Sequence, residues 1–119
     1  MNLERNQRIS EHFSSIKSSG KVLELSEGKI KIDGSLDFIN GLLSVVESDI
    51  ISFKCVHEIQ LDNEATAMHY DIVQISKASF LVIKEESLKF RQQCFNQEAQ
   101  MKIDAATLTD EEFEALLSA

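Results

Sequence analysis

The sequence predicts a single α+β domain, and two patterns in it lead to this fold class. In the middle of the chain, apolar and polar residues alternate along ISFKCVHEIQL and again along ATAMHYDIVQIS, which is typical of paired strands with one buried face. Near the two ends, apolar residues recur every three or four positions instead, which is typical of amphipathic helices. Because 119 residues provide material for one hydrophobic core, residues 1–119 are expected to form one domain.

The N-terminal third is expected to form two helices with a short extended region between them. Apolar residues share one face of a helix over residues 3–19, and Gly20 is placed to end it. Residues 21–33 favour two short extended pieces around a glycine-containing turn. A second helix follows over roughly 35–47, with Ser35 as its N-cap.

The alternating segments from residue 51 onward are expected to pair as an antiparallel hairpin. A two-residue turn at Asn63-Glu64 sets the register. This register places His57 opposite Tyr70 on the mainly apolar face of the sheet. It places Glu58 beside His69 on the other face, where ordinary exposed polar groups are favoured over a metal site.

A second hairpin and a short helix are expected to complete the chain. SFLVIK and LKFRQQCF, within residues 79–95, favour strands joined by a turn at Glu85-Glu86-Ser87. Further on, Thr109 and Glu112 have the spacing of a capping box. The acidic run at residues 110–112 therefore indicates the start of a helix, where negative charge favours the helix dipole.

Composition disfavours several classes of partner and location. The chain has 12 Lys and Arg against 20 Asp and Glu, and its formal net charge of −8 disfavours nucleic acids and anionic membrane surfaces. No apolar run approaches the ~20 residues that span a bilayer, and the first residues lack the apolar segment of a signal peptide. We therefore expect a cytoplasmic protein. Cys55 and Cys94 lack the spacing of a disulfide framework or zinc site, and buried free thiols are expected.

Three stretches of the chain carry a resemblance to a known family. Residues 33–39 (DGSLDFI) are a small-residue entry into a helix, residues 52–74 read as a central hairpin, and residues 79–95 as a closing hairpin. In this order they resemble the ketosteroid isomerase-like (SnoaL-like, nuclear transport factor 2-like) superfamily. The resemblance implies a cone-shaped, curved antiparallel sheet covered by the N-terminal helices, with a short C-terminal helix.

The catalytic residues of the isomerase branch of this superfamily are not matched in the chain. That branch uses an Asp base and an oxyanion hole made from a Tyr and a protonated Asp. Here Phe13 occupies the inward stripe of the first helix, and Lys77-Ala78 stands where the protonated Asp is sought. Glu27 and Asp33 are the carboxylates left as unaligned candidates for the base.

The candidate site is the apolar face of the predicted hairpin. His57 and Tyr70 would act there as general base and hydrogen-bond donor toward an enclosed ligand, or would satisfy one another inside a core. The side chains expected to line the cavity are Phe13, Phe53, Cys55, Met68, Phe90 and Gln92. No cofactor or metal is expected, because the glycines are isolated and metal-ligand spacing is lacking.

Two classes of function stay open on the sequence alone. The first is a protein that binds a small apolar molecule inside the cone, with isomerase, cyclase or dehydratase chemistry at His57 and Tyr70. The second is a non-catalytic acidic interaction module, such as a secretion chaperone, an immunity protein or a scaffold subunit. A homodimer through the outer face of the sheet is expected, because that face carries Val56, Ala67 and Val73 and because the family resemblance implies dimerisation through it.

Overall fold

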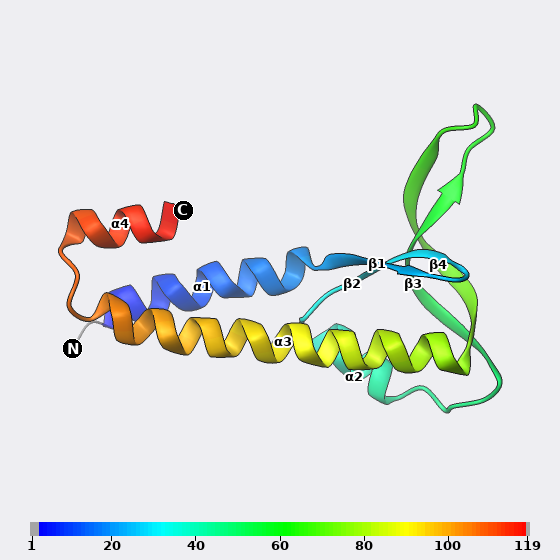
Figure 1. The fold of residues 1–119 in the computed structure, drawn as a ribbon, viewed down its shortest axis with the longest axis horizontal. Coiled ribbons are helices and arrows are strands. Elements are labelled where there is room, and N and C mark those ends of the chain that lie inside the picture. The colour runs from blue at the N-terminus through cyan, green and yellow to red at the C-terminus, as the bar shows by residue number, and fades with distance from the viewer. Residues whose placement is uncertain (1–2, 119) are drawn as a thin grey trace.

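The computed structural model describes residues 3–118, which form four helices and one four-stranded antiparallel sheet (Figure 1). In chain order the elements are α1 (Leu3–Ser19), β1 (Lys21–Leu25), β2 (Gly28–Ile32), α2 (Leu36–Leu43), β3 (Ile50–Gln60), β4 (Thr66–Ser76), α3 (Lys77–Ala105) and α4 (Asp110–Ser118). The α+β class is confirmed, with an N-terminal helix and a short C-terminal helix. The sheet is not closed, because β1 and β4 lie at its two edges.

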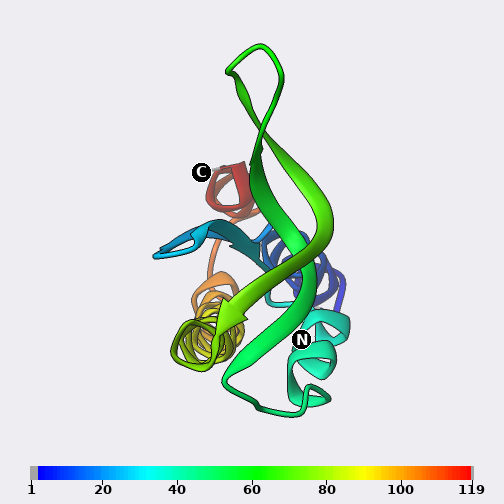
Figure 2. The same ribbon diagram turned by 90° about the vertical axis from the view of Figure 1, so that its right-hand side faces the viewer.

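The sheet is very unevenly paired along its length. β3 and β4 are in register over all 11 residues of each strand, whereas β2 pairs with β3 only through Ile30–His57 and Lys31–Val56. The far end of the β3–β4 hairpin therefore projects from the body as a twisted two-stranded arm (Figures 1 and 2). An isolated two-stranded ribbon is marginally stable in water, so this arm requires additional contacts to stabilise it.

The helix-end signals predicted at Gly20, Ser35 and Thr109 are confirmed, whereas α2 ends at Leu43 with Ser44 as its C-cap, earlier than the predicted residue 47. Gly20 has φ of 67°, the left-handed conformation that ends α1 without steric cost. Ser35 caps α2 by accepting a hydrogen bond from the Phe38 N–H at 3.3 Å. Thr109 and Glu112 exchange side-chain to backbone hydrogen bonds at 3.2 and 3.0 Å, which is the capping box of α4.

The predicted second hairpin is wrong, because residues 79–95 lie within α3, a helix of 29 residues. Its buried residues Phe80, Ile83, Ser87 and Cys94 recur at spacings of three, four and seven, which is one face of a helix. The expected turn contains two glutamates, which are good helix formers, and no Gly or Pro interrupts residues 77–105. The third stretch behind the family resemblance is therefore helical.

The hydrophobic interior is divided into two clusters that α3 joins. One lies between the sheet, α2 and the first half of α3, and its fully buried members include Ile30, Ile32 and Phe80. The other lies between α1, α4 and the second half of α3, around Phe13 and Phe113. Figure 1 shows the sheet at one end of α3 and α4 at the other, which is why the two clusters are separate.

The molecule is more extended than a compact domain of its size. Its radius of gyration is 17.8 Å and its extents are 52 × 36 × 18 Å, whereas a compact chain of this length has a radius of about 13.5 Å. It exposes 7758 Å² to solvent, compared with about 6,500 Å² for a folded monomer of this mass. The excess is therefore about 1,250 Å².

The two cysteines and the lengths of the helices bear on two predictions from the sequence. Cys55 and Cys94 are buried and free, as predicted, and burial raises the pKa of the Cys55 thiol to about 11. None of the helices within residues 3–118 combines the length and apolar character needed to cross a membrane.

Candidate functional site

The turn of the β3–β4 hairpin is one residue longer than the sequence predicts. It contains three residues, Asp62-Asn63-Glu64, and is closed by a hydrogen bond of 2.8 Å from the Leu61 N–H to the Ala65 carbonyl. Glu64 has φ of 66°, the left-handed conformation that three-residue hairpin loops use at this point. The strands therefore pair as Gln60 with Thr66.

This difference of one residue changes which side chains share a face of the sheet. His57 lies opposite His69, and Tyr70 lies opposite Val56. His57 and Tyr70 therefore project from opposite faces, since neighbouring strand residues alternate. The predicted pairing of His57 with Tyr70 is wrong, and so is that of Glu58 with His69, because Glu58 lies opposite Met68.

His57 lies on the core side of the sheet, on the face opposite to its predicted partner Tyr70. It is half-buried next to Ile30 of β2, and its Nε2 is buried without a hydrogen-bond partner within residues 3–118. The opposite His69 is exposed. An unpaired buried nitrogen costs free energy. A general base must lie within hydrogen-bond reach of the proton that it removes, and His57 does not line the open groove that lies between α2 and β3.

The six residues expected to line one cavity are distributed over separate parts of the molecule. Phe53 and Cys55 belong to the cluster beneath the sheet, whereas Phe13 and Phe90 pack in the cluster around α1. Met68 is exposed on the hairpin arm. Gln92 is exposed on α3, where its amide donates to the side chain of Asn96 at 3.0 Å. The structure therefore does not gather them around a single ligand.

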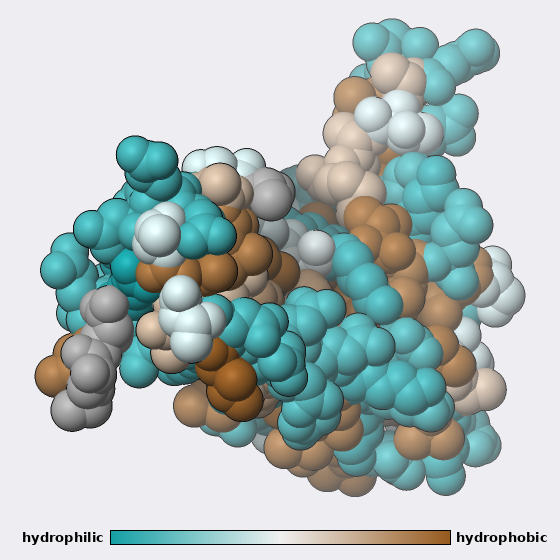
Figure 3. Space-filling model, turned by 60° about the vertical axis from the view of Figure 1, so that its left-hand side comes forward, coloured by the Kyte–Doolittle hydropathy of each residue, from teal (hydrophilic) through white to brown (hydrophobic). Residues whose placement is uncertain are grey.

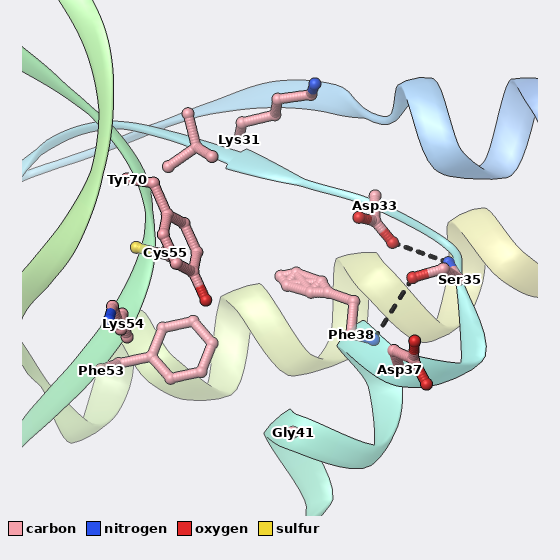
Figure 4. A pocket seen from close by; sticks show the side chains of 11 residues that line it. Lys31, Asp33, Ser35, Asp37, Phe38, Gly41, Phe53, Lys54, Cys55 and Tyr70 are labelled. Carbon is pink, nitrogen blue, oxygen red and sulfur yellow. Dashed lines mark hydrogen bonds between the residues drawn. The ribbon is translucent and has the colours of Figure 1, made fainter.

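An open groove lies where β2 diverges from β3 and α2 follows (Figure 4). Its volume is about 330 Å³. Phe38, Phe53 and Tyr70 contribute aromatic surface, and the rings of Phe38 and Phe53 are stacked with centroids 6.2 Å apart. In Figure 4 the hydroxyl of Tyr70 points toward the space between these two rings.

The divergence of β2 from β3 follows from the contacts of Gly34. Its N–H donates to the Lys17 carbonyl at 2.8 Å, and its own carbonyl accepts from Arg91 Nη1 at 2.7 Å. A Cβ at this position would lie 3.3 Å from Lys17 Cγ and 3.4 Å from Arg91 Cα. Gly34 therefore allows the chain to pass between α1 and α3, which carries it away from β3 and into α2.

The charged groups of the groove are arranged asymmetrically. Lys31 and Lys54 lie on the sheet side, and the Lys54 ammonium is 5.4 Å from the centroid of the Tyr70 ring. Neither lysine has a carboxylate partner among residues 3–118. Asp33 and Asp37 lie on the helix side, and Asp33 Oδ1 accepts from the Ser35 N–H at 2.7 Å.

The backbone of β3 is also available at the groove. The Ile72 N–H of β4 donates to the Asp71 side chain at 2.8 Å, which indicates that Ile72 directs its backbone groups away from β3. In an antiparallel pair, the residue opposite such a position also directs its backbone outward. That residue is Lys54, whose outer side faces the groove because β2 has already diverged.

The sequence pattern did not reveal this groove. Asp33 lies in the loop after β2, Phe38 on α2 and Lys54 on β3, and only the divergence of β2 and β3 brings them together. The one available signal is the Asp33-Gly34-Ser35 turn before α2, which the family resemblance had already singled out.

Comparisons of the chain with protein-family models, with curated proteins and with solved structures found no match. Among residues 3–118, no group of three or more His, Cys, Asp or Glu side chains is arranged to hold a metal ion.

Proposed function

We propose that this protein is a non-catalytic acidic interaction module that binds an extended segment of a partner protein in the groove between α2 and β3. The observation that carries the proposal is the combination of aromatic surface with an unpaired strand edge in one open groove. Addition of a peptide strand to an exposed sheet edge is a common mode of peptide recognition, in which pockets for side chains give specificity.

The lining of the groove defines the chemistry of the segment. Phe38, Phe53 and Tyr70 favour one large apolar or aromatic side chain. Lys31 and Lys54, which lack ion pairs within the described chain, favour an acidic residue next to it. The backbone of Lys54 can hydrogen-bond to the main chain of the segment.

The enzyme hypothesis has less support from the geometry. His57 and Tyr70 lie on opposite faces of the sheet, and a proton-transfer site needs its groups within hydrogen-bond reach of one substrate. A small apolar molecule in the groove is the second candidate, because about 330 Å³ is within the range of ligand pockets. The family resemblance stays a prediction, and so does the homodimer.

Gly41 offers a direct way to test the groove. It lies on α2 at the edge of the groove, and a Cβ built there meets no other atom within 4 Å (Figure 4). Gly41→Leu should therefore fill part of the groove without disturbing the core. Gly41→Ala is the matched control, because it adds only a methyl group at the same position.

The experiment selects peptides from a random displayed library on the wild-type protein and measures their affinities. Tyr70 is the only tyrosine and there is no tryptophan, so at a fixed protein concentration intrinsic fluorescence reports on this groove for peptides that contain no Tyr or Trp. We expect enriched peptides with a large apolar residue beside an acidic one. They should bind Gly41→Ala normally, and Gly41→Leu and Lys54→Glu about tenfold more weakly or worse.

Two results would contradict the proposal. Peptides that bind Gly41→Leu as tightly as the wild type would place the binding surface elsewhere. Failure to enrich any peptide, together with binding of small aromatic compounds that Gly41→Leu abolishes, would favour the small-ligand function instead.

A further inference from the structure

β4 forms an open edge of the sheet, on which the side chains of Asp71 and Glu27 accept hydrogen bonds from the N–H groups of Ile72 and Ser76. On its outer side no strand pairs with it within the described chain, since the strand order is β1-β2-β3-β4. Its sequence, TAMHYDIVQIS, contains no Lys and no Pro, and its register with β3 runs without a bulge. Natural proteins ordinarily block long exposed edges with these devices, because open edges recruit further strands.

The outer side of β4 presents both backbone groups and apolar side chains. The bond from the Ile72 N–H to Asp71 marks Ile72 as outward-directed, and by alternation Tyr70 and Met68 are outward-directed as well. Met68, Tyr70 and Ile72 also share one face of the sheet, where 42, 60 and 61% of their surfaces are exposed. This face and this edge are a docking surface without an occupant.

We propose that the occupant is a second copy of this chain, whose β4 pairs antiparallel with the first about a two-fold axis at Tyr70. The two four-stranded sheets then form one continuous sheet of eight strands. The homodimer predicted from the sequence used an outer face with Val56, Ala67 and Val73, but the register divides these residues between the two faces, and the β4 edge takes its place. Tyr70 on the axis also lines the peptide groove, whereas His69, Asp71 and Ile72, which the solution test changes, do not.

The charges of β4 favour this register over its neighbours. With Tyr70 on the axis, His69 of each copy lies opposite Asp71 of the other, and Met68 lies opposite Ile72. With Asp71 on the axis, two carboxylates would face each other, which is unfavourable. With His69 on the axis, Asp71 would lie opposite Ala67 and lose its imidazole partner.

The chain has a net charge of −8, but the face of the sheet that surrounds Tyr70 does not repel a second copy. The residues on the same face of β2 and β3 include Lys29, Lys31 and Lys54, and the acidic Glu58 is paired with Lys29 at 3.7 Å. Glu24 of β1 also lies on this face, opposite Lys29, so these three lysines face two glutamates and the neighbouring strands add no acidic surplus to the contact.

The excess surface of the chain is sufficient for such a contact. A standard stable interface removes about 800 Å² from each partner, and this chain exposes about 1,250 Å² more than a compact monomer of its mass. Pairing along β4 would also cover one side of the projecting arm, which accounts for a two-stranded ribbon that is otherwise marginal.

The first test measures the mass of the full chain in solution by sedimentation over a range of concentrations. We expect a dimer, and His69→Asp should weaken it about tenfold or more, because it places Asp opposite Asp. The double variant His69→Asp/Asp71→His exchanges the two side chains and should restore the dimer. Ile72→Lys should also weaken it, whereas Ile50→Lys, at an equally exposed Ile on β3, should not.

The second test places a cysteine on the axis. Tyr70→Cys should form a disulfide-linked dimer under mild oxidation, because position 70 faces itself across the axis. Met68→Cys, on the same face, should cross-link much less, and the native Cys55 and Cys94 are buried.

The proposal is overturned by a monomer at every concentration, by a dimer that these substitutions leave unchanged, or by equal cross-linking at positions 68 and 70. Circular dichroism of each variant separates loss of pairing from loss of folding. Peptide binding to Gly41→Ala and Gly41→Leu is measured separately, so failure of the dimer does not decide the proposed function.

Discussion

Glu27 shows how a single exposed side chain holds distant parts of the fold together. It lies in the β1–β2 turn and accepts hydrogen bonds from the Ser76 N–H at 2.8 Å and the Ser79 hydroxyl at 2.7 Å. These bonds, with one from Ser26, lower the pKa of the Glu27 carboxyl to about 2. The β1–β2 hairpin therefore helps to cap the N-terminus of α3.

Glu27→Gln should reduce the free energy of unfolding at pH 7 by about 1 kcal/mol, a value typical of an exposed cap. The folded-state pKa lies below the ordinary value of 4.5, so this contribution is present above about pH 4.5 and is lost as pH falls toward 2. Urea unfolding from pH 7 to pH 3 should show the wild type and the variant converging at the acidic end. Glu24→Gln, on the adjacent strand, is the control, and equal convergence there would contradict this role for Glu27.

At the scale of elements, the starts of α2 and α4 were readable from the sequence, but the helical state of residues 79–95 was not. The caps at Ser35 and Thr109 depend on neighbouring residues only, so their signals are local. SFLVIK favours a strand by residue type, because several of its residues are β-branched or aromatic. Its buried apolar residues, Phe80 and Ile83, nevertheless lie on one face of a helix, because α3 packs against both clusters.

The capping box of α4 gives a prediction at this scale. Thr109→Ala should reduce the free energy of unfolding by about 1 kcal/mol, because the Glu112 N–H loses its acceptor at the start of the helix. Thr109→Ser keeps the hydroxyl and should be close to the wild type. Urea unfolding followed by far-UV circular dichroism makes the comparison, and equal losses for Ala and Ser would show that the hydroxyl is not what stabilises this helix.

At the scale of the whole molecule, two hydrophobic clusters share one long helix. α4 is held to α1 by Arg5, which donates to the carbonyls of Ala105 and Leu108 at 2.7 Å each and lies 5.0 Å from the centroid of the Phe113 ring. The sheet cluster has no residue in common with this one. Such an arrangement predicts local unfolding of one end without the other.

Phe113→Ala should increase amide hydrogen exchange in α4 and α1 and leave β3 and β4 protected. Phe113 is 2% exposed, and the loss of such a ring costs about 3 kcal/mol. Exchange measured by mass spectrometry gives the result segment by segment, and Leu88→Ala, at a half-exposed position of α3, is the control. A uniform rise in exchange over the whole chain would mean that the two clusters unfold as one unit.

The sequence by itself determined the α+β class, the end of α1, the starts of α2 and α4, the existence of the β3–β4 hairpin and the burial of both cysteines. These features depend on local periodicity and on caps a few residues apart. Only the tertiary structure decided the register of the hairpin, because one extra turn residue exchanges the faces of every side chain. It alone decided the helical state of α3 and the groove beside Lys54, because both depend on packing between segments distant in the chain. The apparent His57–Tyr70 site was a product of the predicted register, whereas the groove and the open β4 edge are products of the fold.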